Sequence, residues 1–348
     1  MNNKMIAAMF YGLNKPIVIE EVEIPKPGRD EVLVDVKACG VCGSDIHIVF
    51  ENADVGFLPI ILGHEPAGVI AEVGPNVDEF KKGDRVAVST LIPCGKCINC
   101  LAGRESICLY KKLLGIQLNG GLAEYMVVPI NNIIKLPDSM PFEHGALVTD
   151  AVATPYHALV KRGKLKIGEK VAIFGCGGLG FHAVQIAKIC GASQIIAVDV
   201  NNVALERAKK VGATDTVNPA EEDSVNAIMN LTDQIGVDLV LEVIGLQKTI
   251  AQGAQCLKRG GRLVVVGLGA DDICVLPPNI FVRSELSVLG SSAWDRSDII
   301  DIISLVQRKR LDLSGSISGR YKLDDINVAL EHLKTKKDNP IRLVIVQD

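Results

Sequence analysis

The sequence has no secretion signal and no apolar stretch long enough to span a bilayer. Its first residues, MNNKMIAAMFYG, do not place a sustained apolar run behind a basic head, as a signal peptide would. A membrane-spanning helix needs about 20 consecutive apolar residues. We therefore expect a cytoplasmic protein without membrane partners, in which the ten cysteines are thiols and metal ligands rather than disulfides.

The sequence also lacks a large excess of charge, tandem repeats and low-complexity tracts. The formal net charge is −4 and charged residues make up 22% of the chain, which gives no electrostatic reason to expect nucleic acid or anionic membranes as partners. Small molecules are the expected partners instead. The 348 residues, of which 48% are hydrophobic, suit two globular domains.

The hydrophobic pattern changes character near residue 150. Residues 1–150 contain short alternating runs such as EVLVDVKA and AGVIAEVG, broken by Gly and Pro, which indicate a β-rich, barrel-like domain. Residues 151–289 alternate strand and helix patterns, among them the helical TIAQGAQCLKRG, and this predicts a doubly wound parallel sheet. Residues 290–348 contain two amphipathic helices and the strand IRLVIV, which either extend the sheet or return to the first domain.

A dinucleotide-binding pattern opens the second domain. In VAIFGCGGLGFHAVQIAK the spacing G-x-G-x-x-G falls on Gly175, Gly177 and Gly180, after a predicted strand and at the start of a predicted helix. Such glycines permit a tight turn, close approach of the backbone to a pyrophosphate and close helix–strand packing. A Gly-rich turn without a ligand is the alternative, but the next strand, QIIAVDV, ends in Asp199 at about the expected distance.

Asp199 favours NAD over NADP as the cofactor. A carboxylate at this strand end accepts hydrogen bonds from the ribose hydroxyls of NAD and repels the 2′-phosphate of NADP. The following residues, DVNN, contain no Arg that could bind this phosphate. We therefore predict NAD, held by the Gly-rich turn that includes Gly178 and Leu179.

Four cysteines form a second pattern. PCGKCINCLAGRESIC has the spacing C-x2-C-x2-C-x7-C, and four thiolates on one loop can close a tetrahedron around a structural zinc ion. The ligands would be Cys94, Cys97, Cys100 and Cys108. A zinc ribbon that binds nucleic acid or protein is the less favoured alternative, because only Lys96 and Arg104 are basic between the cysteines and the loop has no aromatic residue.

The stretch KACGVCGSDIH contains a C-x-x-C pair, Cys39 and Cys42. By spacing alone it is a redox pair, half of a zinc finger or one corner of an active site. GVCGSDIH is followed by GHEPAG, the four-cysteine loop and a nucleotide-binding pattern, in that order. Together these motifs resemble the zinc-dependent medium-chain alcohol dehydrogenases over essentially the whole chain.

This resemblance implies a GroES-like catalytic domain, residues 1–150 with 290–348 returning to it, and a Rossmann NAD-binding domain, residues 151–289. The fold class would be α/β. The family likeness also implies two zinc ions per chain and a homo-oligomer, a tetramer or dimer.

The resemblance further implies that Cys42 and His64 bind a catalytic zinc ion, with Cys39 a bystander. At the third ligand position, where many relatives have Cys, this sequence has Asp150, and some bacterial secondary-alcohol dehydrogenases also have Asp there. A carboxylate preserves the ligand charge. The local rivals are Glu143, His144 and His157, and the alternative role for Asp150 is to cap the helix that begins AVAT.

The remaining roles are likewise implied by the family. Ser44 would receive the alcohol proton and His47 would relay it to solvent, because imidazole exchanges protons near neutral pH. Asp45 and Glu65 would orient the zinc ligands, and Thr154 would pack against the nicotinamide. For Ser44 a helix N-cap, and for Asp45 an exposed turn carboxylate, are the alternatives.

The substrate is predicted to be a hydrophobic or cyclic secondary alcohol, converted to its ketone. The positions that line the pocket in this family are mostly apolar here: Val49, Phe50, Phe57, Ile116 and Trp294. A cyclic hydroxyacyl-CoA thioester or a polyol is the alternative substrate. Zinc-free quinone reductases on the same fold lack Cys42, His64 and the four cysteines, and are disfavoured.

Overall fold

The computed structural model describes residues 3–347, and the chain forms two compact units. Unit 1 contains the chain up to Ala153 and again from Trp294 onward, and unit 2 is Thr154–Ala293. Unit 1 is therefore built from both ends of the sequence, with unit 2 inserted between them. Within the described range no helix is long and apolar enough to cross a membrane.

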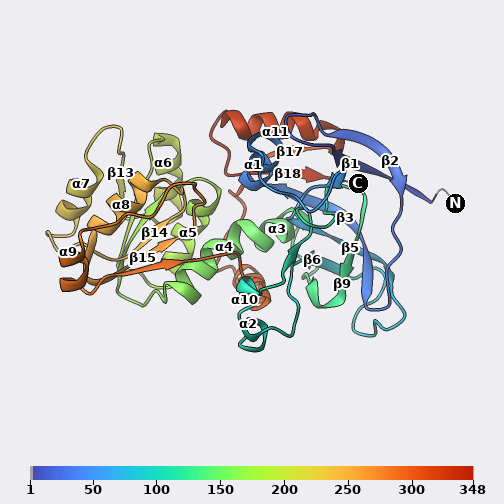
Figure 1. Ribbon diagram of the computed structural model, residues 1–348, viewed down its shortest axis with the longest axis horizontal. Coiled ribbons are helices and arrows are strands. Elements are labelled where there is room, and N and C mark those ends of the chain that lie inside the picture. The colour runs from blue at the N-terminus through green and yellow to red at the C-terminus, as the bar shows by residue number, and fades with distance from the viewer. Residues whose placement is uncertain (1–2, 348) are drawn as a thin grey trace. The chain divides into compact units, whose positions relative to one another are not determined.

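Unit 1 is rich in short strands (Figure 1). They are β1 (Lys4–Phe10), β2 (Val18–Glu23), β3 (Glu31–Val41), β4 (Ile60–Ile61), β5 (Pro66–Val73), β6 (Arg85–Val88), β7 (Leu91–Ile92), β8 (Lys112–Leu113), β9 (Tyr125–Pro129), β10 (Ile133–Lys135), β17 (Ile317–Tyr321) and β18 (Arg342–Val346). The largest sheet has the order β10-β6-β5-β3-β18-β17, with β9 also paired to β3. Its central strand β3 is almost fully buried.

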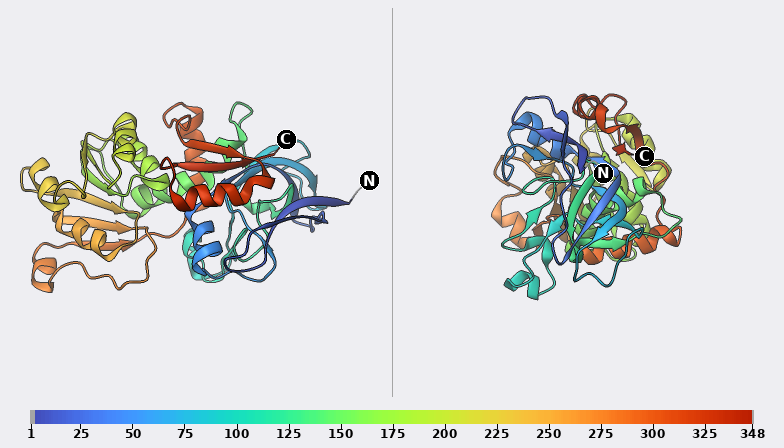
Figure 2. Two further views of the ribbon diagram at one scale, coloured as in Figure 1. Left: turned by 90° about the horizontal axis from the view of Figure 1, so that it is seen from above. Right: turned by 90° about the vertical axis from the view of Figure 1, so that its right-hand side faces the viewer.

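The helical segments of unit 1 connect or cover these strands. They are α1 (Gly43–Glu51), α2 (Ile98–Leu101), η1 (Glu105–Ile107), η2 (Ile130–Asn132), α3 (Phe142–Leu147), η3 (Val148–Val152), α10 (Arg296–Gln307), η5 (Leu323–Asp325) and α11 (Ile326–Thr335). The chain after residue 290 joins the first unit, because β18 pairs antiparallel with β3, with Leu343 opposite Val41. Figure 2 shows the C-terminal strands and α11 in red beside the blue N-terminal segments.

Unit 2 is a parallel sheet with helices between its strands. Its elements are η4 (His157–Arg162), β11 (Lys170–Phe174), α5 (Gly178–Ile189), β12 (Gln194–Val198), α6 (Asn202–Val211), β13 (Asp215–Val217), α7 (Ser224–Leu231), β14 (Val237–Glu242), α8 (Gln247–Gln255), β15 (Leu257–Val265), α9 (Pro278–Arg283) and β16 (Ser287–Gly290). α4 (Ala153–Tyr156) precedes η4. The strand order β13-β12-β11-β14-β15-β16 is that of a Rossmann fold, and this confirms the predicted α/β class.

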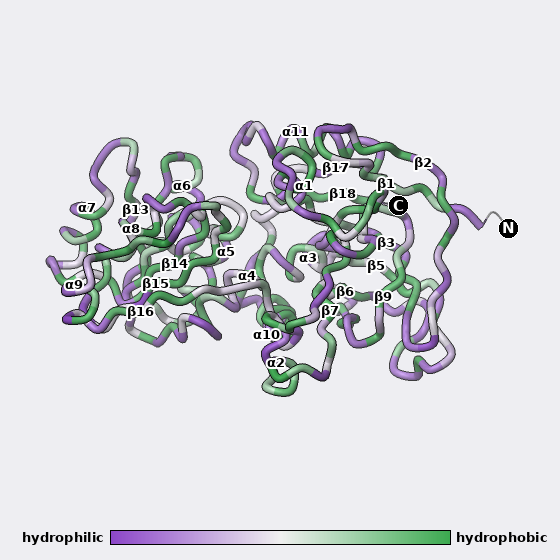
Figure 3. The backbone as a smooth tube through the Cα atoms, viewed as in Figure 1, coloured by the Kyte–Doolittle hydropathy of each residue, from purple (hydrophilic) through white to green (hydrophobic). Residues whose placement is uncertain are grey.

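The inner strands β11, β12 and β14 of unit 2 are mostly apolar because helices pack against the sheet. β14 is buried at every position, and Figure 3 shows hydrophobic colour along β14 and β15. Such continuous apolar runs are typical of parallel strands that are covered on both faces.

One predicted helix is wrong at its end. The sequence suggested a helix through TIAQGAQCLKRG, but α8 ends at Gln255 and β15 begins at Leu257. Gly260 has a φ of +72°, a conformation that a right-handed helix does not contain. The conformation of Gly260 therefore excludes a helix through KRG, although α8 has already ended before CLK.

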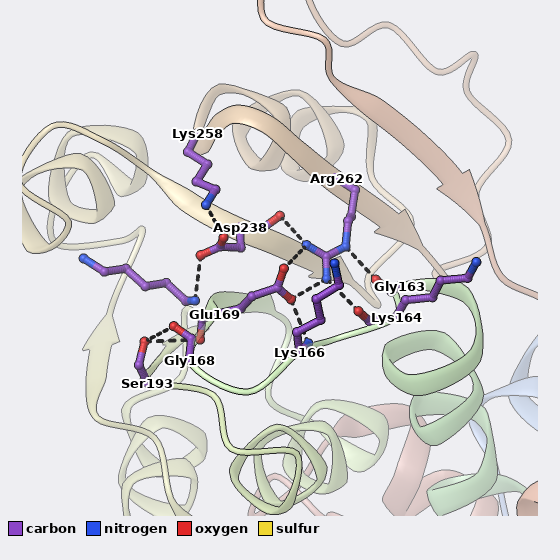
Figure 4. Close-up of polar contacts among 10 residues, drawn as sticks. Gly163, Lys164, Lys166, Gly168, Glu169, Ser193, Asp238, Lys258 and Arg262 are labelled. Atoms are coloured by element: carbon purple, nitrogen blue, oxygen red, sulfur yellow. Dashed lines mark hydrogen bonds and ion pairs between the residues drawn. The ribbon is translucent and has the colours of Figure 1, made fainter.

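A polar network holds the end of the unit 2 sheet at which β11 and β14 begin (Figure 4). Arg262 donates from Nη1 to Glu169 Oε1 at 3.0 Å and also binds the Gly163 carbonyl. Asp238 accepts from the Lys170 N–H at 2.8 Å and forms an ion pair with Lys258. These contacts link three neighbouring strands at the edge opposite the Gly-rich turn.

Candidate functional site

The junction between β3 and α1 places a thiol at a helix N-terminus. Cys42 is the N-cap of α1, and the Asp45 Oδ2 accepts a hydrogen bond from the Cys42 N–H at 2.9 Å. Asp45 is only 1% exposed, so it is not an exposed turn carboxylate, and Ser44 is not the N-cap. The junction thus fixes the Cys42 backbone and directs one carboxylate into the interior.

Four potential ligands converge at this thiol. Cys42, His64, Glu65 and Asp150 are all buried, and one ligand atom from each lies within 4.8 Å of the others. The Cys42 Sγ is 3.4 Å from the Asp150 Oδ2. Bonds of 2.0–2.3 Å to tetrahedral zinc place ligand atoms roughly 3.3–3.8 Å apart, so this donor set fits a zinc ion.

His64 follows β4 and precedes β5. Its carbonyl accepts a hydrogen bond from Thr90 Oγ1 at 2.9 Å, and its Nδ1 is 3.5 Å from the Asp45 Oδ1. Burial would lower the pKa of His64, but the neighbouring Asp45 carboxylate outweighs it and raises the pKa well above the ordinary value. Asp45 therefore orients the imidazole.

Arg342 is the residue of this site that the sequence reasoning missed. Its Nη2 lies 3.2 Å from the Glu65 Oε1 and 3.6 Å from the Asp150 Oδ2, and its side chain is 5% exposed. Burial acts to raise the pKa of the Cys42 thiol, but the Arg342 guanidinium reverses this and lowers it. An Arg in the otherwise apolar strand IRLVIV was the available signal, since a buried Arg requires an anionic partner.

Several buried polar atoms in this cluster have no hydrogen-bond partner. Within residues 3–347 these include both Glu65 carboxylate oxygens, His64 Nδ1 and Asp45 Oδ1. Burial raises the pKa of Glu65 well above its ordinary value, although Arg342 opposes the shift. Unsatisfied polar atoms are costly in a protein interior, and a cation bound between the donors would compensate for this cost.

The rival third ligands lie outside the convergent set. Glu143 forms an ion pair with Arg320, and His144 lies with it on α3. His157 is buried in η4. Asp150 lies in η3, in a helical run that already began at Phe142, so it does not cap a helix start.

The predicted proton relay lies along one face of α1. The Ser44 Oγ is 3.5 Å from the Cys42 Sγ. His47 is exposed, and its Nδ1 is 2.5 Å from the Glu51 Oε2. Thr154, by contrast, belongs to α4 at the start of unit 2, where it is buried.

The four-cysteine loop also brings its sulfurs together. Ligand atoms of Cys94, Cys97, Cys100 and Cys108 lie within 4.8 Å of one another, and all four are free of disulfides. The Cys97 Sγ is 3.5 Å from the Cys100 Sγ and 3.9 Å from the Cys108 Sγ. Backbone N–H groups near Cys100 and Leu109 donate to Cys97 and contribute to lowering its pKa to about 6, which suits a thiolate ligand.

The Gly-rich turn of unit 2 has the features of a phosphate-binding loop. Gly175 has a φ of +96°, and a Cβ on Gly180 would lie 1.7 Å from the Gly175 carbonyl oxygen, so both positions require glycine. A Cβ on Gly177 would meet no described atom within 4 Å. This open space beside the N-terminus of α5, which starts at Gly178 with Leu179 next, can accept a pyrophosphate.

Asp199 supports this turn directly. Its Oδ2 accepts from the Cys176 N–H at 2.7 Å and its Oδ1 accepts from the Asn201 N–H at 2.9 Å. On the neighbouring strand β14, the fully buried Glu242 accepts from the Ile244 and Gly245 N–H groups. Both carboxylates therefore fix loops at the carboxyl edge of the sheet, where Rossmann folds bind dinucleotides.

The predicted substrate-lining residues do not form one surface within unit 1. Val49 and Trp294 are buried, and the Trp294 indole N–H donates to the Ser89 Oγ at 3.3 Å. Phe57 lines a cavity of about 490 Å³ together with Phe10 and Leu13. Neither Cys42, His64 nor Asp150 lines this cavity, and Phe50 and Ile116 pack against the core of unit 1.

A Rossmann unit joined to a β-rich unit with a buried Cys–His–carboxylate set defines the class of zinc-type dehydrogenases. Known proteins agree with this class. Residues 28–138 match the family Alcohol dehydrogenase GroES-like domain, and residues 178–308 match the family Zinc-binding dehydrogenase.

Relatives match over almost the entire chain. An L-threonine 3-dehydrogenase from Pyrococcus horikoshii is 36% identical over 98% of this chain and 99% of its own. An alcohol dehydrogenase from Geobacillus stearothermophilus is 38% identical over 96% and 97%. The structure of a zinc-binding dehydrogenase from Sinorhizobium meliloti 1021 bound to NADP is 32% identical, covers 99% of each chain and has a TM-score of 0.90.

The chain belongs to the zinc-dependent medium-chain dehydrogenase family. It is an oxidoreductase of the alcohol dehydrogenase type, with a GroES-like domain and a Rossmann domain. The family resemblance expected from the sequence motifs is thereby confirmed.

Proposed function

We propose that this protein interconverts a secondary alcohol and its ketone, with NAD as the hydride acceptor and a catalytic zinc ion. The observation that carries the proposal is the buried convergence of Cys42, His64 and Asp150, a set of one thiolate, one imidazole and one carboxylate. Three protein ligands leave one tetrahedral position for a substrate oxygen.

Cys42, His64 and Asp150 would hold the catalytic ion, and the four cysteines Cys94, Cys97, Cys100 and Cys108 would hold a structural one. When bound, the catalytic zinc supplies Lewis acidity that polarises an oxygen substituent. Four thiolates fill a tetrahedral shell, so the structural ion stabilises its loop and leaves no position for a substrate.

Side chains of this protein would transfer the proton, orient the zinc ligands and balance their charge. Ser44, next to Cys42 on the first turn of α1, would accept the proton of the substrate hydroxyl and give up its own hydroxyl proton toward His47, which would release a proton to solvent. Asp45 orients His64, and Glu65, held by Arg342, balances the charge beside the ligands. Glu65 also belongs to the buried group of potential ligands, but its ion pair with Arg342 favours the charge-balancing role.

NAD is the proposed cofactor, bound at Gly175, Gly177, Gly178, Leu179 and Gly180 with Thr154 against the nicotinamide. Asp199 supports this choice, because its negative charge at the end of β12 opposes a 2′-phosphate. The relative from Sinorhizobium meliloti binds NADP, so the two cofactors must be compared directly.

For the substrate we propose a hydrophobic or cyclic secondary alcohol, on the basis of the apolar sequence positions Val49, Phe50, Phe57, Ile116 and Trp294, although these residues do not form one surface within unit 1. L-threonine is the second candidate, because several relatives are L-threonine 3-dehydrogenases and its hydroxyl is also secondary. A polyol and a cyclic hydroxyacyl-CoA thioester complete the substrate panel.

The test is a substrate and metal assay on the purified protein. We expect two zinc ions per chain and NADH formation, followed by absorbance, with cyclic or branched secondary alcohols. L-threonine as the best substrate would replace the proposed alcohol but keep the reaction class. Active protein with one zinc ion or none would contradict the proposed site.

A further inference from the structure

We infer that Glu51 is a positioning residue of the proton relay: it holds the His47 ring so that Nε2 is free to accept the proton that leaves Ser44. This inference rests on the proposed function. It is carried by the short contact between the His47 Nδ1 and the Glu51 Oε2, 2.5 Å, and by the placement of these residues on α1.

Residues 44, 47 and 51 lie three and four positions apart on one helix, so their side chains share one face. The face leads from the interior outward: Ser44 is partly buried beside the Cys42 Sγ, whereas the His47 and Glu51 side chains are 50% and 59% exposed. One face of α1 thus carries polar side chains from the partly buried Ser44 to the exposed Glu51.

The contact selects one form of the imidazole. A carboxylate only accepts hydrogen bonds, so Nδ1 must carry the hydrogen, and Nε2 of the neutral ring is then the acceptor. When Nε2–H forms, both ring nitrogens carry a hydrogen and Nδ1–H keeps its contact with the Glu51 carboxylate. The ring then gives one proton to water or buffer, and Glu51 itself is unchanged.

Other charged groups lie near α1. On α11, which packs against α1, Lys334 lies 3.9 Å from the centre of the Phe50 ring and 3.9 Å from the Glu331 Oε2. Lys15 and Asp54 lie on the segments beside α1. In the part of the chain that the structure describes, the ion pair recorded for His47 is the one with Glu51.

An exposed ion pair of this type contributes little to stability, typically below about 1 kcal/mol. Its removal should therefore change proton transfer without unfolding the protein. Glu331 provides a matched control, because it is 60% exposed and also forms an ion pair within its own helix. Glu51→Gln and Glu331→Gln remove the same charge from neighbouring helices.

The experiment compares kcat for alcohol oxidation by both variants and the unmodified enzyme between pH 6 and 9. We expect Glu51→Gln to lower kcat roughly 3- to 10-fold below neutral pH, with little change at high pH, where hydroxide can take the proton. A higher buffer concentration should restore the rate. Glu331→Gln should follow the unmodified enzyme at every pH.

Nitrogen NMR of the His47 ring gives a readout independent of activity. We expect the Nδ1–H form in the unmodified protein and a mixture with the Nε2–H form in Glu51→Gln. A loss of kcat that is equal at all pH values, an unchanged profile or an unchanged ring form would each overturn the role of Glu51.

His47→Gln separates this inference from the proposed function. If His47→Gln alters the pH profile and Glu51→Gln does not, the role of Glu51 is wrong and the relay remains. If neither variant alters the dependence of kcat on pH, or if no alcohol is oxidised, the proposed relay is wrong, and so is the role of Glu51 in it.

Discussion

Arg342 in the last strand forms a buried ion pair with Glu65, with 3.2 Å between the Arg342 Nη2 and the Glu65 Oε1. The same nitrogen lies 3.6 Å from the Asp150 Oδ2. One guanidinium therefore faces two carboxylates and the Cys42 thiol, which together would carry three negative charges. Arg342 and a bound zinc ion would together neutralise these negative charges.

Arg342→Met should destabilise the metal-free protein more than the zinc-loaded protein. Removal of one partner of a buried pair costs about 3–5 kcal/mol, and zinc would compensate part of this loss by its own positive charge. The measurement is the thermal midpoint with zinc and with a chelator. Arg342→Lys keeps the positive charge, and its thermal midpoint should fall less than that of Arg342→Met. If Arg342→Met lowers the thermal midpoint equally with zinc and with chelator, zinc does not share the neutralisation with Arg342.

Asp150→Ala should remove one of the two zinc ions, because two protein ligands are too few to hold the ion. Activity should fall by more than about 100-fold, the upper range for residues that only support a ligand. Asp150→Cys should recover zinc and part of the activity. The assay is zinc content per chain together with kcat.

His144→Ala is the control for Asp150, since His144 lies on α3 outside the convergent set. It should retain both ions and most of the activity. Two zinc ions in Asp150→Ala and one in His144→Ala would show that the third ligand has been misassigned.

Asp199→Gly should reduce the preference for NAD over NADP. The loss of the carboxylate removes the repulsion of the 2′-phosphate, and we expect the ratio of kcat/KM values to fall by roughly 10-fold or more, which is about 1.4 kcal/mol. Because Asp199 also accepts from the Cys176 N–H, Asp199→Asn is the better control for charge alone. Equal use of both cofactors by the unmodified enzyme would refute the assignment.

Asp238→Asn should lower stability at neutral pH and much less at acidic pH. Burial opposes ionisation of Asp238, but the Lys258 ammonium outweighs it and holds the pKa below the usual value. The stabilisation is therefore complete above the unfolded pKa of about 4 and is lost as the pH falls through the folded pKa. Lys258 is 41% exposed, so we expect only about 1 kcal/mol at pH 7.

The measurement for Asp238 is the urea midpoint of both proteins at pH 7 and near pH 3. Zinc release at low pH affects both proteins equally, so the difference between them isolates the carboxylate. If the urea midpoints of the two proteins differ by the same amount at both pH values, the stability does not depend on ionisation of Asp238.

The α/β class was predictable because its signals are local. A glycine pattern between a strand and a helix specifies a turn whose geometry few other residues permit, and Gly175 and Gly180 meet this requirement. Alternating strand and helix periods then imply parallel pairing. The end of α8 was missed because helix propensity continues through CLK, whereas the chain leaves the helix after Gln255 and Leu257 begins β15. The pairing of β15 with β14 is a tertiary feature.

The sequence predicted the candidate-site residues that lie within recognisable motifs, but it did not predict Arg342, which lies outside them. Cys42, Asp45, His64 and Glu65 lie in two short motifs. Arg342 reaches the same cluster only because β18 pairs with β3, and that register is a tertiary feature. The contact between His47 and Glu51 could have been predicted from the sequence, because residues four positions apart lie on the same face of a helix.

The pairing of β18 with β3 also bears on how the protein is made. The N-terminal part of a chain leaves the ribosome first during synthesis. The ligand residues Cys42, His64 and Asp150 therefore emerge before unit 2, and Arg342 emerges after it. Until β18 is synthesised, β3 lacks a neighbour and the acidic cluster lacks its guanidinium. Unit 1 therefore completes its main sheet only after the whole of unit 2 has been synthesised.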